Sequence, residues 1–298
     1  MNNGLAIKTC ELTKQYGRIS VVDRLSLRVP KQQITAFLGR NGAGKSTTIK
    51  MLLGIASPSS GTGSVLGKMI RDASQNRELR REVAYVAEDK QLYSYMTVGQ
   101  LIRFTRSFYS DWRTDTETRL LKQFQLPLSQ KVKALSKGMR TKLALLLALS
   151  RQPQLLIMDE PSEGLDPVSV EELLHEIVGA AASGVTVFFS SHQIAEVERI
   201  ADRACIIDHG KLLVDTSLED MRRDYRRITL SFDADPPAVG LFLPGIQQVR
   251  TNGRQMTLLA KENVDAVVEL TRDMHPASIE VSPVGLREVF LETVKEER

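Results

Sequence analysis

A glycine-rich segment at residues 39–47 constrains this chain more than any other feature. It reads GRNGAGKST, it follows an apolar run at 34–38, and a helical pattern begins at its last residue. Glycines let backbone N–H groups turn toward an anion without a Cβ in the way, and a helix N-terminus adds a positive dipole end. The order of strand, glycine-rich turn and helix is typical of a P-loop. The residues predicted to bind phosphates are Gly39, Asn41, Gly42, Ala43, Gly44, Lys45, Ser46 and Thr47.

Two side chains of this loop have distinct predicted roles. Lys45 is placed to reach the β- and γ-phosphates of a nucleoside triphosphate, and the Ser46 hydroxyl is a ligand for Mg²⁺. The alternative is a glycine-rich turn that happens to precede a lysine, but the flanking strand and helix argue against it. We therefore expect the chain to bind a nucleoside triphosphate together with Mg²⁺.

Length and composition are those of an ordinary globular protein. The 298 residues are enough for one large domain and a smaller one, and 42% of them are hydrophobic. The net charge is +4, and because acidic and basic residues are interspersed, nucleic acid is not an expected partner. The longest apolar stretch, at 143–149, is much shorter than the roughly 20 residues that span a bilayer. The sequence therefore predicts no membrane span.

The cysteines and the first residues indicate the compartment. The N-terminus lacks the basic and apolar regions of a signal peptide. Cys10 and Cys205 stand apart from any metal-binding or disulfide pattern, so both are predicted to be small buried hydrophobic residues. A reducing cytosolic compartment fits this pattern.

Hydrophobic periodicity predicts an α/β domain over residues 1–219. Residues 6–29 alternate apolar and polar positions, which predicts strands. Ser- and Gly-rich residues 57–63 are typical of a loop. Helical patterns separate the later strands, which favours a mainly parallel sheet covered on both faces, with a helical subdomain at about 92–152. Buried strands are predicted at 34–38, 83–87, 155–158 and 185–189, and a final hairpin at 204–211.

The remaining residues, 220–298, are predicted to form a small α+β domain. The charged segment 219–227 is interpreted as the connection between the two domains. Asn252-Gly253 is a dipeptide typical of a hairpin turn. Strands are predicted at 228–232, 255–259 and 279–281, and helices at 264–274 and 286–294.

Four short segments follow the P-loop in order: ALSKGMR at 134–140, MDEP at 158–161, SEGLD at 162–166 and SSH at 190–192. Together with the P-loop, and with KQYG at 14–17, this ordered set resembles the ATP-binding-cassette family, specifically the ATPase subunit of an ABC transporter. The resemblance covers about residues 5–217. It implies a P-loop NTPase cassette that binds and hydrolyses ATP.

The resemblance implies a catalytic group at the ends of two buried strands. Asp159 holds Mg²⁺ opposite Ser46, and Glu160 acts as general base by polarising the attacking water. His192 bonds the γ-phosphate and orients that water. An exposed strand end is the alternative for Asp159-Glu160, but the apolar run before it and the P-loop upstream disfavour that alternative.

Four further residues are implied to contact the nucleotide. Ser136 and Gly138 face the γ-phosphate that the other subunit's P-loop holds, Asp166 crosses the dimer interface, and Tyr16 stacks on adenine. Ser136 is alternatively a plain helix N-cap. Tyr16 is alternatively a turn aromatic that covers the sheet.

Two positions depart from the family's pattern. Glu88 stands where a glutamine normally senses Mg²⁺ and relays nucleotide state, with Gln91 a weaker candidate for the same role. A carboxylate also ligates Mg²⁺, so Glu88 is predicted to keep the relay with altered metal dependence. Lys137 replaces the usual glycine of the signature segment and adds positive charge there.

The resemblance also implies partners. Two chains face head to tail with two ATP molecules between them, and they power a separate ABC-2-type permease, with export as the expected direction. The expected location is peripheral, at the cytoplasmic face of the cell membrane, with residues 93–108 in the docking surface. The tail, with GLREVFL at 285–291, resembles the C-terminal extension of such subunits.

Three alternatives stay open. A soluble ABC ATPase of translation or DNA repair is disfavoured by the single cassette and the absence of sustained heptads. A P-loop kinase or GTPase is disfavoured by the signature segment and His192. A regulatory ABC module that binds ATP without useful turnover is kept open by Glu88 and Lys137.

Overall fold

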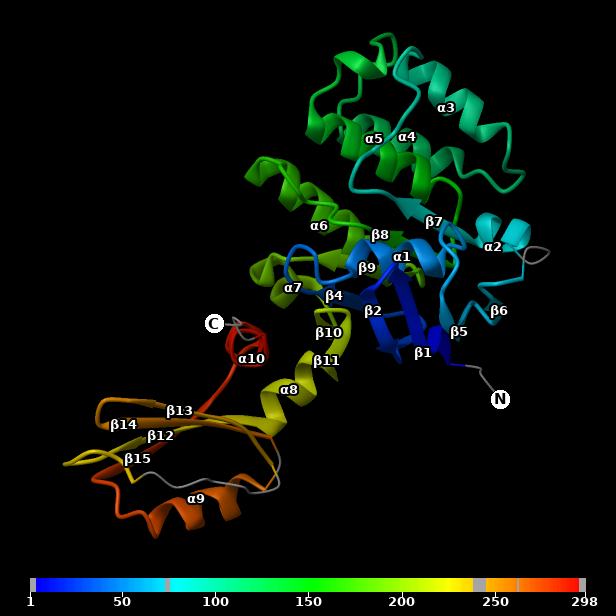
Figure 1. Cartoon of the computed structure of the whole chain (residues 1–298). Coiled ribbons are helices and arrows are strands. Elements are labelled where there is room, and N and C mark those ends of the chain that lie inside the picture. The colour runs from blue at the N-terminus through cyan, green and yellow to red at the C-terminus, as the bar shows by residue number, and fades with distance from the viewer. Residues whose placement is uncertain (1–3, 73–75, 238–244, 262, 295–298) are drawn as a thin grey trace. The chain divides into compact units, whose positions relative to one another are not determined.

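A computed structural model describes residues 4–72, 76–237, 245–261 and 263–294 of the chain (Figure 1). The chain divides into two compact units, Met1–Asp215 and Thr216–Arg298. The sequence-based boundary at 219–220 falls inside helix α8 (Leu218–Asp224), which belongs to the second unit. Within the described ranges, no helix has both the length and the apolar character that crossing a bilayer requires.

A six-stranded sheet forms the centre of the first unit, in the order β11-β10-β4-β9-β8-β7. The strands are β4 (Ile34–Leu38), β7 (Val83–Val86), β8 (Leu155–Met158), β9 (Thr186–Ser191), β10 (Arg203–Asp208) and β11 (Lys211–Ser217). All pairs from β10 to β7 are parallel. Every residue of β4, β8 and β9 is buried, as expected for a parallel sheet covered on both faces. The predicted parallel sheet is therefore confirmed.

A second, antiparallel sheet precedes it, in the order β2-β1-β5-β6 with β3 also paired to β1. Its strands are β1 (Leu5–Tyr16), β2 (Ile19–Leu25), β3 (Arg28–Pro30), β5 (Ser60–Val65) and β6 (Lys68–Met69). The predicted loop at 57–63 is wrong from Ser60 onward. A Cβ on Gly61 would lie 2.2 Å from the Glu11 carbonyl oxygen, so the glycine marks close strand approach rather than a loop.

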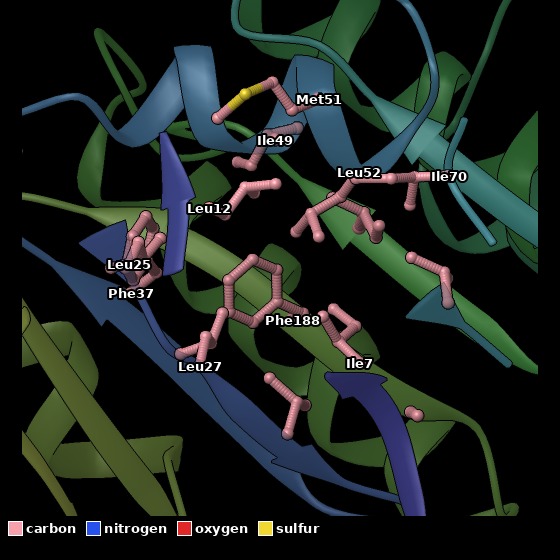
Figure 2. Packing of buried hydrophobic residues seen from close by; sticks show 14 of the residues in the cluster. Ile7, Leu12, Leu25, Leu27, Phe37, Ile49, Met51, Leu52, Ile70 and Phe188 are labelled. Carbon is pink, nitrogen blue, oxygen red and sulfur yellow. The ribbon is translucent and has the colours of Figure 1, made fainter. Parts of the chain in front are cut away.

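Helix α1 (Lys45–Leu52) supplies the centre of the hydrophobic core. Its Ile49, Met51 and Leu52 are fully buried in one cluster with side chains of both sheets (Figure 2). Phe37 and Phe188 of the central sheet lie in the same cluster, with ring centroids 5.5 Å apart. Each such side chain contributes roughly 1.5–3 kcal/mol when it is buried. The P-loop is thus anchored on both sides by packed apolar residues.

The remaining helices of the first unit either pack on the central sheet or form a helical subdomain around α5. The predicted helical subdomain contains α3 (Val98–Arg106), α4 (Thr114–Gln123), a 3-10 turn (Val132–Ala134) and α5 (Lys137–Leu149). Helix α2 (Asn76–Glu82) precedes β7, α6 (Pro167–Ala182) packs on β9, and α7 (Ile194–Ile200) packs on β4. Cys205 is buried as predicted, but Cys10 is exposed because it lies on the solvent side of β1, so that prediction is wrong.

The second unit is an antiparallel sheet in the order β13-β14-β12-β15, with α9 (Val264–Arg272) packed on β12 and β14. The strands are β12 (Tyr225–Ser231), β13 (Ile246–Asn252), β14 (Gln255–Lys261) and β15 (Ser278–Pro283), and α10 (Leu286–Thr293) ends the described chain. The hairpin turn at Asn252-Gly253 is confirmed, since Asn252 pairs with Gln255. The core of the second unit contains Ile228, Leu230, Phe232, Met256, Leu258, Ala260 and Val267.

The interpretation of residues 219–227 as a connection is wrong. Ser217 caps α8 by accepting a hydrogen bond from the Asp220 N–H at 2.9 Å, and Tyr225 begins β12 directly after the helix. Acidic residues occupy the first turn of α8 and basic residues the last, which complements the helix dipole. The charges therefore stabilise a helix that buries Leu218 and Met221.

Candidate functional site

The carboxyl ends of four neighbouring strands meet at one edge of the central sheet. β4 leads into the glycine-rich loop, β9 ends before His192, β8 ends before Asp159, and β7 ends two residues before Glu88. Because parallel strands share this edge, residues far apart in the sequence converge on it. A pocket of about 340 Å³ opens here, lined by Val21, Asn41, Gly42, Gly44, Lys45, Ser46, Thr47, Glu88, Glu160, Glu163 and His192.

The loop between β4 and α1 has the geometry of an anion cradle. Gly42 and Gly44 have φ angles of 84° and 103°, in the left-handed region that favours glycine. A Cβ on Gly44 would lie 2.6 Å from the Val21 carbonyl oxygen. Gly44 is also the N-cap of α1, and no side chain caps this helix start. The first N–H groups of α1 are therefore available to a ligand, and the helix dipole favours an anion there.

Lys45 is buried, with its ammonium held by backbone oxygens and one carboxylate. Its Nζ donates to the carbonyl oxygens of Gly39 at 2.7 Å and Arg40 at 3.1 Å. The same Nζ lies 3.0 Å from Oε1 of Glu160, and both side chains are more than nine-tenths buried. Separating a buried ion pair is costly unless a new partner replaces one of its members. An incoming phosphate that attracts Lys45 is such a partner, and it would release Glu160.

Glu160 connects Lys45 to His192. Its second oxygen, Oε2, lies 2.9 Å from Nδ1 of His192, and Nε2 of His192 lies 3.5 Å from Oε2 of Glu163. Glu160 has a φ of 42°, a conformation that costs on the order of 1–3 kcal/mol and is concentrated at functional sites. The structure thus brings the three residues predicted as catalytic into one continuous set of contacts.

Asp159 lies beside this set and is held by a buried hydroxyl. Its Oδ1 accepts a hydrogen bond from Ser190 Oγ at 2.6 Å, and that hydroxyl accepts one from the Glu160 N–H at 2.9 Å. Burial, followed by the charges of Asp159 and Glu88, raises the pKa of Tyr85 to about 12. Tyr85 is therefore a neutral neighbour of the acidic edge at physiological pH.

The three predicted Mg²⁺ ligands, Ser46, Asp159 and Glu88, line a second cavity of about 410 Å³. Ser46 and Glu88 line both cavities, so the two adjoin. All three residues offer oxygen atoms, the donors that Mg²⁺ prefers. Across the described ranges, no three His, Cys, Asp or Glu side chains gather as a metal cage. The residues present fit an ion shared with phosphates and water, which is the usual situation of Mg²⁺.

Ser136, Gly138 and Asp166 lie together but outside the pocket. Ser136 Oγ accepts a hydrogen bond from the Met139 N–H at 3.2 Å and caps α5. A Cβ on Gly138 would lie 3.0 Å from Ser169 Oγ and 3.8 Å from Asp166 Oδ2. Asp166 caps α6, and hydrogen bonds from the Ser169 hydroxyl and N–H hold its pKa below the usual value. All three are described residues, and none of them lines the 340 Å³ pocket.

Tyr16 is likewise placed outside the described lining of the pocket. Tyr16 is 55% exposed at the end of β1, and Lys14 Nζ lies 4.8 Å from the centroid of its ring. The exposed face leaves the ring available to a stacked base, which is the role predicted for it.

Glu88 and Lys137, the two departures from the family pattern, both influence the pKa of Lys90. Burial, followed by the charge of Lys137, lowers the pKa of Lys90 to about 8, while Glu88 and Asp159 act in the opposite direction. Lys137 also packs on Gly164, because a Cβ on that glycine would lie 2.5 Å from Nζ of Lys137. Lys137 therefore covers the turn after Glu160 in its own chain.

Sequence reasoning missed two acids beside the pocket. Glu163 was part of the turn at 162–166 but had no predicted role, although a charge three residues after the predicted general base was a usable signal. Glu196, on α7, accepts a hydrogen bond from Ser162 Oγ at 2.6 Å, and both residues are buried. Burial raises the pKa of Glu196.

Two family models match the first unit. One, described as ABC transporter, covers residues 22–163. The other, described as AAA domain, putative AbiEii toxin, Type IV TA system, covers residues 129–198.

The chain is similar to bacterial proteins along most of its length. It is 35% identical over 231 residues to the uncharacterized ABC transporter ATP-binding protein YhaQ of Bacillus subtilis (strain 168), covering 75% of this chain and 76% of that protein. It is 34% identical over 226 residues to the bacitracin transport ATP-binding protein BcrA of Bacillus licheniformis, covering 74% and 72%. It is 31% identical over 295 residues to the Nod factor export ATP-binding protein I of Rhizobium sp. (strain N33), covering 96% of each.

Solved structures share the fold. One described as the ATP binding subunit of an ABC transporter superposes with a TM-score of 0.66 at 32% identity, covering 73% of this chain and 92% of that one. A dimeric post-hydrolysis structure of the ATP-binding cassette MJ0796, bound to ADP and Pi, gives 0.64 at 20% identity, covering 71% and 98%. The fold class predicted from the sequence is confirmed.

Proposed function

Because this chain belongs to the family of ABC transporter ATP-binding proteins, we propose that it hydrolyses ATP and thereby powers a separate membrane permease. The observation that carries the proposal is the set of contacts from Lys45 through Glu160 to His192, beside the open start of α1. A lysine for phosphate, a carboxylate for water and an imidazole next to that carboxylate are groups that ATP hydrolysis uses.

Each of these residues has a definite part in the proposed reaction. The N–H groups at the start of α1 bind phosphate oxygens, and Lys45 moves its charge from Glu160 to the phosphates. Glu160 is then free to accept a proton from the attacking water as the new bond to phosphorus forms. His192, bonded to Glu160 through Nδ1, fixes the direction of that carboxylate.

Mg²⁺, when bound, neutralises phosphate charge, and Ser46, Asp159 and Glu88 would hold it. Asp159 has the firmest orientation of the three, because Ser190 Oγ holds one of its oxygens at 2.6 Å. The other oxygen is left for the ion or for water on it.

We infer that the complete site needs a second copy of the chain, arranged head to tail. Ser136 and Gly138 start a helix outside their own chain's pocket, so a nucleotide reaches them only from another molecule. The Ser136 oxygen accepts the Met139 N–H, which leaves its own O–H free to donate to a phosphate oxygen. The dimeric MJ0796 cassette, which shares the fold, is consistent with such an assembly.

An exposed aromatic cluster in the helical subdomain supports a protein partner. Tyr93, Tyr95, Phe104 and Phe108 are 50%, 65%, 38% and 62% exposed, and neighbouring rings lie 5.0–5.9 Å apart. A contiguous exposed apolar patch is typical of an interaction site. We propose that it binds an ABC-2-type permease, which places the chain at the cytoplasmic face of the membrane.

Export is the proposed direction of transport. The Rhizobium relative named for Nod factor export is similar over 96% of both chains, and therefore along the second unit as well. The bacitracin transport proteins match over 74% and 75% of the chain.

Glu160→Gln tests the proposal. The amide keeps the shape of the side chain but cannot accept the proton, so ATP should bind, turnover should fall by about 10³, and an ATP-bound dimer should accumulate. Light scattering and single-turnover ATPase assays measure both, on the chain alone and with its permease. Exposed Glu219→Gln is the control. Wild-type protein that binds ATP but hydrolyses none, even with the permease, would instead favour a regulatory module.

A further inference from the structure

Glu163 is a carboxylate aimed into the nucleotide pocket without a role in the proposed reaction. It lines the pocket, and its Oε2 lies 3.5 Å from Nε2 of His192. The other ring nitrogen, Nδ1, is 2.9 Å from Glu160. Each nitrogen of the His192 ring therefore faces a carboxylate: Nδ1 is hydrogen-bonded to Glu160, and Nε2 faces Glu163 at 3.5 Å.

The turn that carries Glu163 is fixed at both of its neighbours. On one side, buried Ser162 donates to Glu196 of α7 at 2.6 Å. On the other side, Gly164 has a φ of 68° and lies against the Lys137 side chain. The Glu163 N–H also donates to the Glu160 carbonyl oxygen at 3.2 Å. The side chain, 41% exposed, therefore projects from a rigid turn rather than from a free loop.

The pocket has an excess of negative charge for a site that binds phosphates. Its lining contains three carboxylates, Glu88, Glu160 and Glu163, but one ammonium group, Lys45. Glu160 is compensated by Lys45 at 3.0 Å, whereas Glu163 faces the His192 ring. Glu163 thus adds negative charge at the end of the pocket where His192 lies.

The end of a nucleotide that meets Glu163 follows from the position of Lys45. A P-loop lysine reaches the β- and γ-phosphates, and the contacts run from Lys45 through Glu160 to His192 and on to Glu163. The γ-phosphate of a triphosphate therefore approaches His192 more closely than any group of a diphosphate does. One ring nitrogen cannot bond both Glu163 and that phosphate.

We propose that Glu163 is a positioning residue that faces Nε2 of His192 and competes there with the terminal phosphate of the nucleotide. It thereby weakens binding of nucleoside triphosphates relative to diphosphates until His192 changes partner. The inference rests on the proposed ATP-binding function. Its physical basis is the repulsion between like charges at short range, reduced by the solvent that reaches a partly exposed side chain.

The test compares two nucleotides on the full-length chain. Affinities for ADP and for an ATP analogue with a non-hydrolysable β,γ bridge are measured by calorimetry with Mg²⁺, in wild type, Glu163→Gln and Glu163→Asp. Glu163→Gln should bind the analogue about five-fold more tightly and ADP less than two-fold more tightly. Glu163→Asp keeps the charge and should resemble wild type. Exposed Glu219→Gln is the matched control for loss of one negative charge.

Different failures have different meanings. Equal tightening of both nucleotides in Glu163→Gln, or weaker binding of the analogue, overturns the competition while wild-type binding still supports the proposed function. Wild-type protein that binds neither nucleotide overturns both. A drop in the KM for ATP with little change in kcat for Glu163→Gln supports the competition, since a merely structural role would alter kcat as well.

Discussion

Two helix starts in this protein were predicted to bind phosphate, and they differ in one respect. Helix α1 begins at Gly44 with no side-chain cap, and its first N–H groups face a pocket that contains Lys45. Helix α5 begins at Ser136, whose oxygen already accepts the Met139 N–H, and the pocket is elsewhere. The first start is thus prepared for an anion within its own chain.

The difference teaches what each start contributes to a shared site. An uncapped start supplies several N–H donors and attracts an anion without help. A serine-capped start is stable when empty and retains one O–H donor. We therefore expect changes at α1 to abolish nucleotide binding, and changes at α5 to affect mainly the closed, two-chain state.

Among the tests of this comparison, the largest effect is expected at Lys45. Lys45→Ala removes the ammonium beside the open start and leaves Glu160 buried without its ion-pair partner. ATP affinity should fall by about 100-fold, since a preorganised charged donor is lost. Fluorescence titration with ATP measures this, with exposed Lys31→Ala as control. Affinity within three-fold of wild type would mean that the N–H groups alone hold the nucleotide.

The packing of the helices next to α5 can be tested at Arg119 of α4. Its guanidinium forms two 2.9 Å bonds to Glu176 of α6, which is 3% exposed, and Gln123 adds a third at 2.8 Å. Arg119→Ala should lower the free energy of unfolding by about 2–3 kcal/mol, because a buried carboxylate loses its main partner. Chemical denaturation measures the change. Arg199→Ala, which breaks an exposed pair with Glu171, should give no measurable change.

The same variant has a pH signature. Burial alone would raise the pKa of Glu176, but the bonds from Arg119 and Gln123 hold it below its usual value. A lowered pKa contributes stability above the unfolded value and loses it as the pH falls through the folded value. The difference between wild type and Arg119→Ala should therefore narrow below about pH 4.5. A constant difference would show that charge is not its source.

Substitutions of Ser136 separate the two roles of its hydroxyl, which are capping α5 and donating a hydrogen bond to a phosphate. Ser136→Ala loses both and should cost about 1 kcal/mol of stability. Ser136→Asp keeps the oxygen that caps the helix but has no donor, whereas Ser136→Thr keeps both. If the O–H serves a phosphate, Ala and Asp should both lower ATPase activity of the assembled transporter by about ten-fold. Full activity in Ser136→Asp would mean that Ser136 is only a cap.

The smallest expected effect is at Glu196, which accepts the hydrogen bond from Ser162 in the turn beside the pocket. A raised pKa means that its stability contribution is present at low pH and lost as the pH rises through the folded value. Glu196→Gln keeps an acceptor for Ser162 without this loss. Its free energy of unfolding relative to wild type should rise as the pH increases above about 4.5, by less than about 1 kcal/mol, as measured by denaturation at several pH values. A relative stability that is flat with pH would contradict the assignment.

Local pattern sufficed wherever one element determined the outcome. The strand at 34–38 and the helix after the glycines were predicted because burial, glycine and helix start act within a few residues. The predictions failed where pairing with a distant segment decided. Gly61 was assigned to a loop, yet it lies against Glu11 of β1. The charges of α8 were interpreted as a connection, yet they lie along a helix that buries Met221.

The sequence by itself determined which chemical groups this protein has: an anion-binding loop, two acids after one buried strand and a histidine after the next. These follow from short stretches whose local physics is complete. Only the tertiary structure decided that Lys45 pairs with Glu160, that Glu163 faces His192, and that Gly138 lies against the cap of α6. Such contacts depend on strand order and side-chain packing, because residues from about 30 to more than a hundred positions apart meet only when the domain assembles.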